Sequence, residues 1–269
     1  AAVEAAHIGW PTPLRDEIPC NATVPAVTPD AVPGVIARFD GCETAKVKVA
    51  ERGQSLADDV ERVAAVRDVM GEGGAVRLDA NGGWSVDQAV DAITRLAPFG
   101  LEYVEQPCAS VEELREVRTA LAHNGIDVRI AADESIRKAE DPLRVAREAA
   151  ADLVVVKVAP LGGVVRALEV VGDCGLPAVV SSALDSSVGI RAGVALAAAL
   201  PDLPHACGLG TVGLLASDVS RDPLVPVGGK VPARQVDVDD DLLEEHAAPE
   251  DRVAWWRERV RAAHAELVA

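Results

Sequence analysis

Five short apolar runs decide the fold, because each of them carries a charged residue near its end. They are TAKVKVA (residues 44–50), AVRLDA (75–80), LEYVEQ (101–106), VRIAAD (128–133) and LVVVKVA (153–159). The charged residues near the ends of these runs are Lys48, Asp79, Glu105, Asp133 and Lys157. A parallel β/α barrel brings the end of every strand to one rim, where its active site lies. The order Lys, Asp, Glu, Asp, Lys therefore predicts a single site.

Three further runs complete a set of strands that is large enough to close a barrel. They are NATVPAV (21–27), AVVSSAL (178–184) and the weaker HACGLG (205–210). Helical periodicity fills the intervals at residues 54–70, 85–97, 110–122, 141–150, 163–172 and 187–200. Strand and helix alternate about every 25 to 30 residues, as in a (β/α)8-type TIM barrel. A doubly wound open sheet is the second choice, disfavoured because no GxGxxG turn follows the first strand.

Bulk composition limits the possible partners. The 269 residues carry a net charge of −17, which opposes binding to nucleic acid and to anionic membranes. Five scattered cysteines form no CxxC pair, and no apolar stretch is long enough to span a bilayer. We therefore expect a cytoplasmic protein, monomeric or homo-oligomeric, that acts on a small molecule. An anionic substrate would require positive charge concentrated locally, by lysines or by a bound metal.

The three acids at consecutive strand ends predict a metal site. If the barrel is correct, Asp79, Glu105 and Asp133 converge, and three unpaired carboxylates that lie close together repel one another. A hard divalent cation with oxygen ligands removes this repulsion, and Mg²⁺ suits a set without His or Cys. The alternative for each acid is a cap on the following helix, where negative charge is favoured.

The lysines have several possible roles. Lys46 and Lys48 share one face of a strand, so each is expected to depress the pKa of the other and to favour a neutral base. A solvated pair at the edge of the sheet is the alternative. Lys157 lies among β-branched residues, and a buried lysine there could form a Schiff base, pair with Asp133 or Glu134, or serve as a second acid/base group.

The other strand ends carry small or hydroxyl-bearing residues. Ser181, Ser182, Gly208 and Gly210 could bind a substrate carboxylate through hydroxyl and backbone N–H groups. Ordinary helix capping is an equal alternative for the serines. Arg77 has the same strand parity as Asp79, so we expect it to face inward and to support the metal ligands.

The C-terminal part departs from this rhythm. After Arg221 the sequence predicts a turn and two short extended pieces, and residues 249–268 predict an amphipathic helix packed on the body. Its apolar positions are Val253, Trp256, Val260, Ala263 and Leu267. Trp255 and Trp256 are interpreted as packing residues.

In order, KVK, LDAN, VEQP, ADES and VVVKVAPLGG resemble the muconate-lactonising branch of the enolase superfamily over about residues 21–220. SSALDSSVGI and ACGLGT extend the likeness, which within the branch is greatest to the o-succinylbenzoate synthase family of menaquinone biosynthesis. The resemblance implies a modified (β/α)7β barrel. It also implies that residues 1–18 are the remnant of a mostly missing N-terminal capping domain, 19–220 the catalytic barrel, and 221–269 a C-terminal return segment with a helix.

The same resemblance implies roles for individual residues. Asp79, Glu105 and Asp133 would bind Mg²⁺, and Lys48 and Lys157 would face opposite sides of the substrate. The reaction implied is the syn-dehydration of 2-succinyl-6-hydroxy-2,4-cyclohexadiene-1-carboxylate through an enediolate, with Lys48 moving the proton and Lys157 stabilising the intermediate. Substrate binding by Lys46, Ser181, Ser182, Gly208 and Gly210 and support from Arg77, Asn81 and Glu134 complete the expected site.

Other functions remain possible on the sequence. An N-succinylamino acid racemase, a muconate cycloisomerase or a dipeptide epimerase would use the same metal and lysines. Gly208 and Gly210 stand where a dipeptide epimerase is expected to carry an acidic pair. A catalytically inactive barrel scaffold is the alternative outside the enzyme class, although nothing structural requires all five charged residues.

Overall fold

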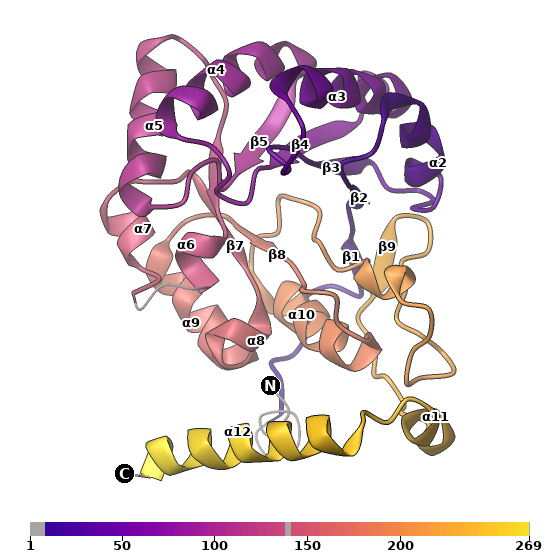
Figure 1. The fold of residues 1–269 in the computed structure, drawn as a ribbon. Helices are drawn as coiled ribbons and strands as arrows, with labels where there is room; N and C mark the ends of the chain where they lie inside the picture. The colour runs from indigo at the N-terminus through magenta and orange to yellow at the C-terminus, as the bar shows by residue number, and fades with distance from the viewer. Residues whose placement is uncertain (1–8, 138–140, 269) are drawn as a thin grey trace.

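A curled parallel sheet forms the centre of the protein (Figure 1). The computed structural model describes residues 9–137 and 141–268. Seven strands follow one another in chain order, β2 (Ala22–Val24), β3 (Thr44–Lys48), β4 (Ala75–Asp79), β5 (Leu101–Glu105), β6 (Ile130–Ala132), β7 (Leu153–Val156) and β8 (Ala178–Val180). Single parallel bridges join Cys207 to Cys20 and Gly208 to Ser181. The predicted eighth strand is therefore no more than this pair of bridging residues, which links the two edges and confirms the barrel.

Helices cover the outer face of the sheet (Figure 1). The long ones are α3 (Leu56–Met70), α4 (Val86–Leu96), α5 (Val111–His123), α9 (Val164–Cys174) and α10 (Ser187–Ala199). Ser55, Ser85 and Ser110 begin the first three with complete capping boxes, in which the serine hydroxyl accepts from the third helical N–H. These signals are local, which is why the sequence predicts the helix starts to within one or two residues.

The prediction for residues 141–150 was too long, because only α7 (Arg144–Arg147) is helical there. Several short helical elements were not predicted from the sequence. They are η1 (Pro29–Ala31), α2 (Val32–Ile36), η2 (Ala97–Phe99), α6 (Glu134–Arg137), α8 (Val158–Leu161), η3 (Thr211–Leu214) and α11 (Asp240–Glu245). Most of them have a single turn or little more, so they offer too few residues for a periodic apolar pattern.

Strand alternation separates two cores. Val154 and Val156 belong to the large core between the sheet and its helices, whereas Leu153 and Val155 lie inside the barrel with Tyr103. Val47, between Lys46 and Lys48, also packs outward. Lys157 continues the inward parity of Val155, so the same alternation that fills the barrel directs its charged strand ends toward the interior.

The C-terminal part differs from its prediction. Between residues 221 and 268, all of which the structure describes, one strand forms, β9 (Lys230–Pro232), and it pairs antiparallel with β1 (Glu17–Pro19). The last helix, α12 (Glu250–Val268), exists as predicted, but it does not pack on the described part of the body, since its described side chains are exposed except for the half-buried Val253. Trp255, Trp256 and Val260 are 44%, 55% and 67% exposed, and the two indoles contact each other edge to face.

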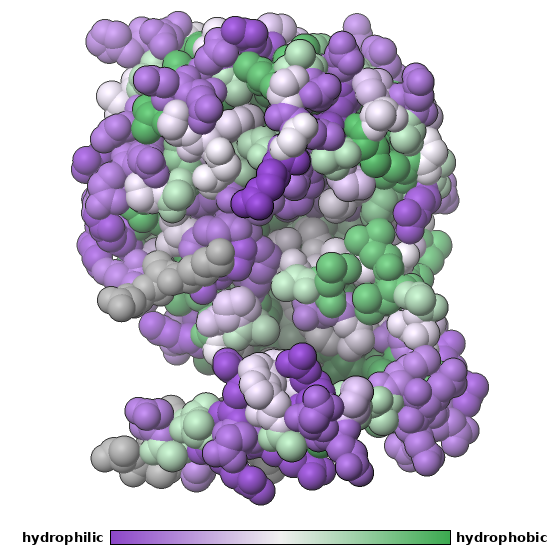
Figure 2. Space-filling view, in the orientation of Figure 1, coloured by the Kyte–Doolittle hydropathy of each residue, from purple (hydrophilic) through white to green (hydrophobic). Residues whose placement is uncertain are grey.

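Hydrophilic residues dominate the visible face of α12 (Figure 2). Residues 250–268 include four arginines and four acids. The side chain of Leu267 lies outside what the structure describes. Residues 1–8 also lie outside it, so the assignment of residues 1–18 to a capping domain stays a prediction. Within the described residues, no helix combines the length and the apolar character that crossing a membrane demands.

The turn before β9 provides a stability prediction. Gly229 has φ +75°, and a Cβ there would lie 2.0 Å from the carbonyl oxygen of Gly41. We expect Gly229→Ala to lower the free energy of unfolding by about 1–3 kcal/mol, through backbone strain and this clash. Gly34 in α2 is the matched control, because a Cβ added there would meet no atom within 4 Å. Gly34→Ala should stabilise by up to about 1 kcal/mol. Urea unfolding of both variants checks the pair, and equal effects would contradict the packing described.

Candidate active site

The charged strand ends form one row across the inside of the barrel. In the strand register Lys48 lies beside Asp79, Asp79 beside Glu105, and Glu105 beside Ala131. Asp133 follows Ala131 by two residues and therefore shares its inward side. Asp79, Glu105 and Asp133 are each about 1% exposed. Burial of three neighbouring carboxylates requires compensating positive charge.

Lysines at both ends of the row supply that charge. The Lys46 Nζ donates to Asp79 Oδ2 at 2.9 Å and to Glu105 Oε1 at 3.2 Å. The Lys48 Nζ donates to Asp79 Oδ2 at 2.7 Å. At the opposite end, Lys157 donates to Asp133, as one of its three predicted roles required. The carboxylates are thus flanked by an amine from β3 and an amine that follows β7.

The ion pairs overturn the expected electrostatics of Lys46. Burial alone would lower its pKa, but the carboxylates of Glu105 and Asp79 outweigh burial and hold the pKa well above its ordinary value. The prediction that its neighbour would depress this pKa was therefore wrong, because the attraction of Glu105 and Asp79 raises the pKa of Lys46 above its ordinary value. Burial opposes the ionised form of Asp79 as well, yet Lys46 and Lys48 keep its pKa below the usual range.

Glu105 is the member of the row whose charge is least compensated. Burial, followed by repulsion from Asp79, raises its pKa from 4.5 to about 7, and Asp133 adds to this repulsion. A divalent cation between the three carboxylates would remove the repulsion that raises the pKa of Glu105. It would add the positive charge that Lys46 and Lys157 do not fully provide.

The residues present fit a divalent cation in their chemistry. The row offers only carboxylate oxygens, all of them buried, from three adjacent strand ends. As the side chains stand among the described residues, no three carboxylate, thiol or imidazole groups are already gathered around a single point as ligands. The carboxylate oxygens instead accept hydrogen bonds from lysine ammonium groups. A cation would therefore compete with Lys46 and Lys48 for the Asp79 carboxylate.

A hydrogen-bond network joins the row to the next loop. Asn81 accepts from the Lys48 Nζ at 2.5 Å, and its own amide nitrogen donates to Glu134 Oε1 at 3.3 Å. Arg137 donates to Asp133 Oδ1 at 3.0 Å and also pairs with Glu134. Asn81 and Glu134 thus stand where supporting residues were predicted, next to Lys48 and Asp133.

Gln106 has a positioning role that the prediction missed. Its side chain is fully buried and its φ is +39°. The side-chain oxygen accepts from the backbone N–H groups of Asp133 and Ser135 at 3.0 and 3.2 Å, and the amide nitrogen donates to Cys108 O at 2.8 Å. The signal was present in VEQP, where an amide side chain directly follows the end of a buried strand.

Replacing Gln106 with leucine should therefore leave two buried N–H groups without an acceptor. We expect the free energy of unfolding to fall by about 1–3 kcal/mol, the usual cost of such unsatisfied groups. Denaturant unfolding of Gln106→Leu measures this directly. Unchanged stability would show that the backbone around Asp133 does not depend on this side chain.

Arg77, predicted to support the metal site, forms no hydrogen bond or ion pair with the carboxylate row in the part of the chain that the structure describes. It faces inward but lies deeper, where it donates to Glu102 Oε2 at 2.9 Å and to Ala206 O at 2.8 Å. Its guanidinium lies 4.6 Å from the centre of the Tyr103 ring. Parity determined its side of the sheet correctly. Arg77 precedes Asp79 by two residues and therefore lies one layer deeper in the barrel. There it reaches Ala206, which directly precedes the bridging residue Cys207.

The predicted carboxylate-binding groups are partly engaged elsewhere. The backbone N–H groups of Ser181 and Gly208 donate within the sheet, to Val156 O and Val180 O at 2.9 Å each. The Ser182 hydroxyl donates to Gly208 O at 2.7 Å and contacts Thr211 at 2.8 Å. The backbone N–H groups of Ser181 and Gly208 are therefore unsuited to hold a ligand, whereas Ser181 and Lys157 line a common pocket. Gly210 follows at the end of the bridging segment, close to Pro226.

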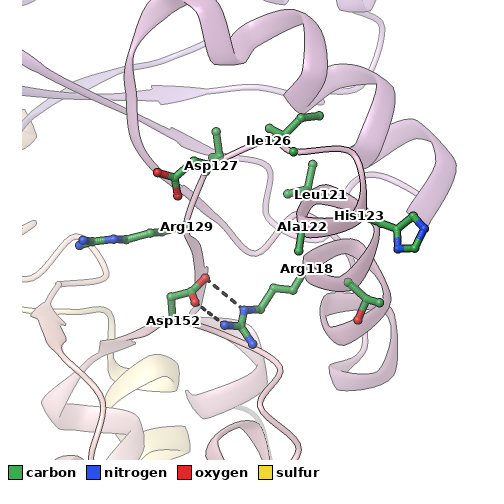
Figure 3. A pocket seen from close by; sticks show the side chains of 11 residues that line it. Arg118, Leu121, Ala122, His123, Ile126, Asp127, Arg129 and Asp152 are labelled. Carbon is green, nitrogen blue, oxygen red and sulfur yellow. Dashed lines mark hydrogen bonds and ion pairs between the residues drawn. The ribbon is translucent and has the colours of Figure 1, made fainter.

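Another cavity lies away from this row. It has a volume of about 810 Å³ and is lined by the segment before β6 and the C-terminal half of α5 (Figure 3). Arg118 and Asp152 point toward each other there and form an ion pair (Figure 3). Residues 127–129 and Asp152 precede their strands, so the cavity lies at the barrel end opposite the carboxylates. It takes no part in the site.

Residues 35–237 match the model of the family described as Enolase C-terminal domain-like. The match spans most of the chain, and the chain belongs to this family. The structure of 2-chloromuconate cycloisomerase from Rhodococcus opacus 1CP is similar, with a TM-score of 0.77 and 25% identity over 88% of this chain and 66% of that one.

Two curated relatives, both called o-succinylbenzoate synthase, narrow the family. The protein from Thermobifida fusca (strain YX) is 59% identical over 98% of this chain and 81% of its own length. The protein from Mycolicibacterium smegmatis (strain ATCC 700084 / mc(2)155) is 59% identical over 98% of this chain and 80% of its own length. Within the wider family, the chain groups with the o-succinylbenzoate synthases.

Proposed function

We propose that this protein is an o-succinylbenzoate synthase, a lyase that dehydrates 2-succinyl-6-hydroxy-2,4-cyclohexadiene-1-carboxylate. The observation that carries the proposal is the buried row of carboxylates flanked by Lys48 and Lys157. The high identity to two synthases supports the choice of this reaction over others of the same family.

Mg²⁺ is the cation that we propose for the row. Asp79, Glu105 and Asp133 would hold it, since an all-oxygen ligand set with open positions suits this ion. When bound, the ion supplies positive charge at the substrate carboxylate, where negative charge develops as the neighbouring proton leaves.

Lys48 moves the proton. As an uncharged amine, Lys48 takes the proton from the carbon that bears the ring carboxylate, and the released electron pair then forms the new ring double bond. The hydroxyl group at the adjacent carbon leaves with its bonding electrons and receives the same proton from Lys48, which yields water. One residue on one face serves as base and then as acid, so the elimination is syn.

Lys157 approaches from the opposite end of the row. Its ammonium group, held by Asp133, faces the negative charge that develops in the substrate and stabilises it without exchanging a proton. Lys46 lies deeper than Lys48 and pairs with two carboxylates, so it compensates their charge and orients them. The proposed roles of the two outer lysines therefore differ, although both are amines.

The test is direct conversion. Purified protein is mixed with 2-succinyl-6-hydroxy-2,4-cyclohexadiene-1-carboxylate and Mg²⁺, and the aromatic product is followed by ultraviolet absorbance. We expect product formation that excess chelator abolishes. Conversion of N-succinylamino acids between enantiomers, without any dehydration, would replace this proposal by a racemase, and inactivity toward both substrates would favour a scaffold.

A further inference from the structure

A pocket of about 250 Å³ extends from the reacting end of the barrel to α10. Lys157 and Ser181 line its inner part, and Arg191 of α10 and Trp10 line it as well. Apolar side chains, among them Val158, Pro160, Val188 and Leu209, contribute to the rest of the lining. The pocket is thus a short, mostly apolar passage that contains the ammonium group of Lys157, already paired with Asp133, and the guanidinium of Arg191.

Among the described residues, no acid pairs with Arg191, the cation on α10. The guanidinium of Arg191 stacks on the Trp10 ring at 4.4 Å from its centre. Within residues 9–137 and 141–268 it has neither a hydrogen bond nor an ion pair, and partial burial lowers its pKa. Arg118 and Arg144, which line other pockets, are by contrast both paired with acids.

The hydrogen bonds of Trp10 and Asp185, which line the same pocket as Arg191, also bear on what binds there. The indole N–H of Trp10 is buried and has no hydrogen-bond acceptor among the described residues. Asp185 also lines the pocket, but its carboxylate accepts from the backbone N–H of Ala183 at 3.1 Å and, in the described part of the chain, forms no ion pair with Arg191. Buried donors without acceptors are uncommon in folded proteins, so an acceptor of hydrogen bonds belongs beside this pair.

We propose that Arg191, stacked on Trp10, binds the distal carboxylate of a dicarboxylate substrate whose other carboxylate lies at the acidic row. This inference rests on the proposed function, because the succinyl arm of that substrate ends in such a carboxylate. The arm runs along the apolar passage, and its end forms charge-assisted hydrogen bonds with the guanidinium. Trp10 holds the guanidinium in place by stacking.

The experiment compares two ligands in the presence of Mg²⁺. One is o-succinylbenzoate, and the other is the same molecule with its distal carboxylate converted to a carboxamide. Calorimetry measures both dissociation constants for the wild-type protein and for Arg191→Met. We expect the wild type to prefer the carboxylate by about 10- to 100-fold, the range of one charged hydrogen-bonding contact, and Arg191→Met to lose this preference.

Controls separate recognition from stability. Arg191→Lys keeps the charge and should retain part of the preference, whereas Arg166→Met removes an exposed arginine of α9 that pairs with Glu169 and should change nothing. A merely structural role for Arg191 would lower the melting temperature of Arg191→Met and leave the discrimination between the two ligands intact. That result overturns the inference.

Failure of the inference can be told apart from failure of the proposed function. If the wild type dehydrates the substrate and Arg191→Met keeps the full carboxylate preference, only the role of Arg191 is refuted. If the wild type neither binds o-succinylbenzoate nor performs dehydration, the proposed function itself is refuted, and this subsite with it.

Discussion

Replacing Lys48 with alanine is expected to lower kcat for dehydration by about 10²–10⁴-fold, the range that a positioned acid/base group contributes. Lys48 is the amine of β3 that reaches the rim, 25% exposed in its side chain, whereas Lys46 is engaged by two buried carboxylates. No other described amine of this strand can take its place. Rates measured by product absorbance at saturating substrate and Mg²⁺ check the expectation.

The loss should be confined to the proton transfer. The Mg²⁺ affinity of Lys48→Ala should stay close to that of the wild type or rise, because its ammonium group competes for the Asp79 carboxylate. Lys230→Ala, which removes an exposed lysine paired with Glu17 on β9 and β1, is the control and should retain full activity. Substantial dehydration by Lys48→Ala with intact Mg²⁺ binding would exclude Lys48 as the base.

Replacing Glu105 with glutamine should abolish the stabilisation of the fold by Mg²⁺, and activity with it. Glu105 lies in the middle of the row, and glutamine keeps the shape while removing the charge that the cation requires. In the wild type, Mg²⁺ at 100 times its dissociation constant should stabilise the fold by about 2.7 kcal/mol. Thermal melts with and without Mg²⁺ measure this stabilisation in the wild type and its loss in Glu105→Gln. Glu116→Gln, on the exposed face of α5, is the control.

The cation-free protein should respond to pH in the opposite sense to an ordinary ion pair. Folding raises the pKa of Glu105 from 4.5 to about 7, so between these values the folded state binds more protons than the unfolded state. Stability should therefore fall as the pH rises from about 4.5 to about 7. Glu105→Gln should flatten this dependence in the presence of chelator. A wild-type protein that becomes more stable over the same interval would contradict the burial of an unbalanced carboxylate.

Strand parity explains why so much of the barrel could be predicted from the sequence. In TAKVKVA the alternation alone predicts that Lys46 and Lys48 share one face, and in the structure both contact Asp79 while Val47 packs in the outer core. Capping serines such as Ser85 are equally local signals. The order of the charged strand ends also depends only on chain order, since the seven strands lie side by side in sequence.

What could not be predicted depends on contacts between distant residues. The pKa of Lys46 rises because Glu105, fifty-nine positions along the chain, lies within 3.3 Å of its Nζ. Arg77 binds the carbonyl of Ala206, and Gln106 binds the backbone at Asp133. For α12, helical spacing predicted the helix but not whether a partner surface within the described chain would cover it.

The most direct test of the central claim is a Mg²⁺ titration of chelator-treated protein, read as the initial rate of aromatic product formation, for the wild type and Glu105→Gln. The buried carboxylate row predicts that the rate of the wild type rises from near zero and saturates, while Glu105→Gln stays inactive throughout. A wild-type rate that is independent of Mg²⁺, or full recovery of Glu105→Gln, would contradict a metal site formed by Asp79, Glu105 and Asp133.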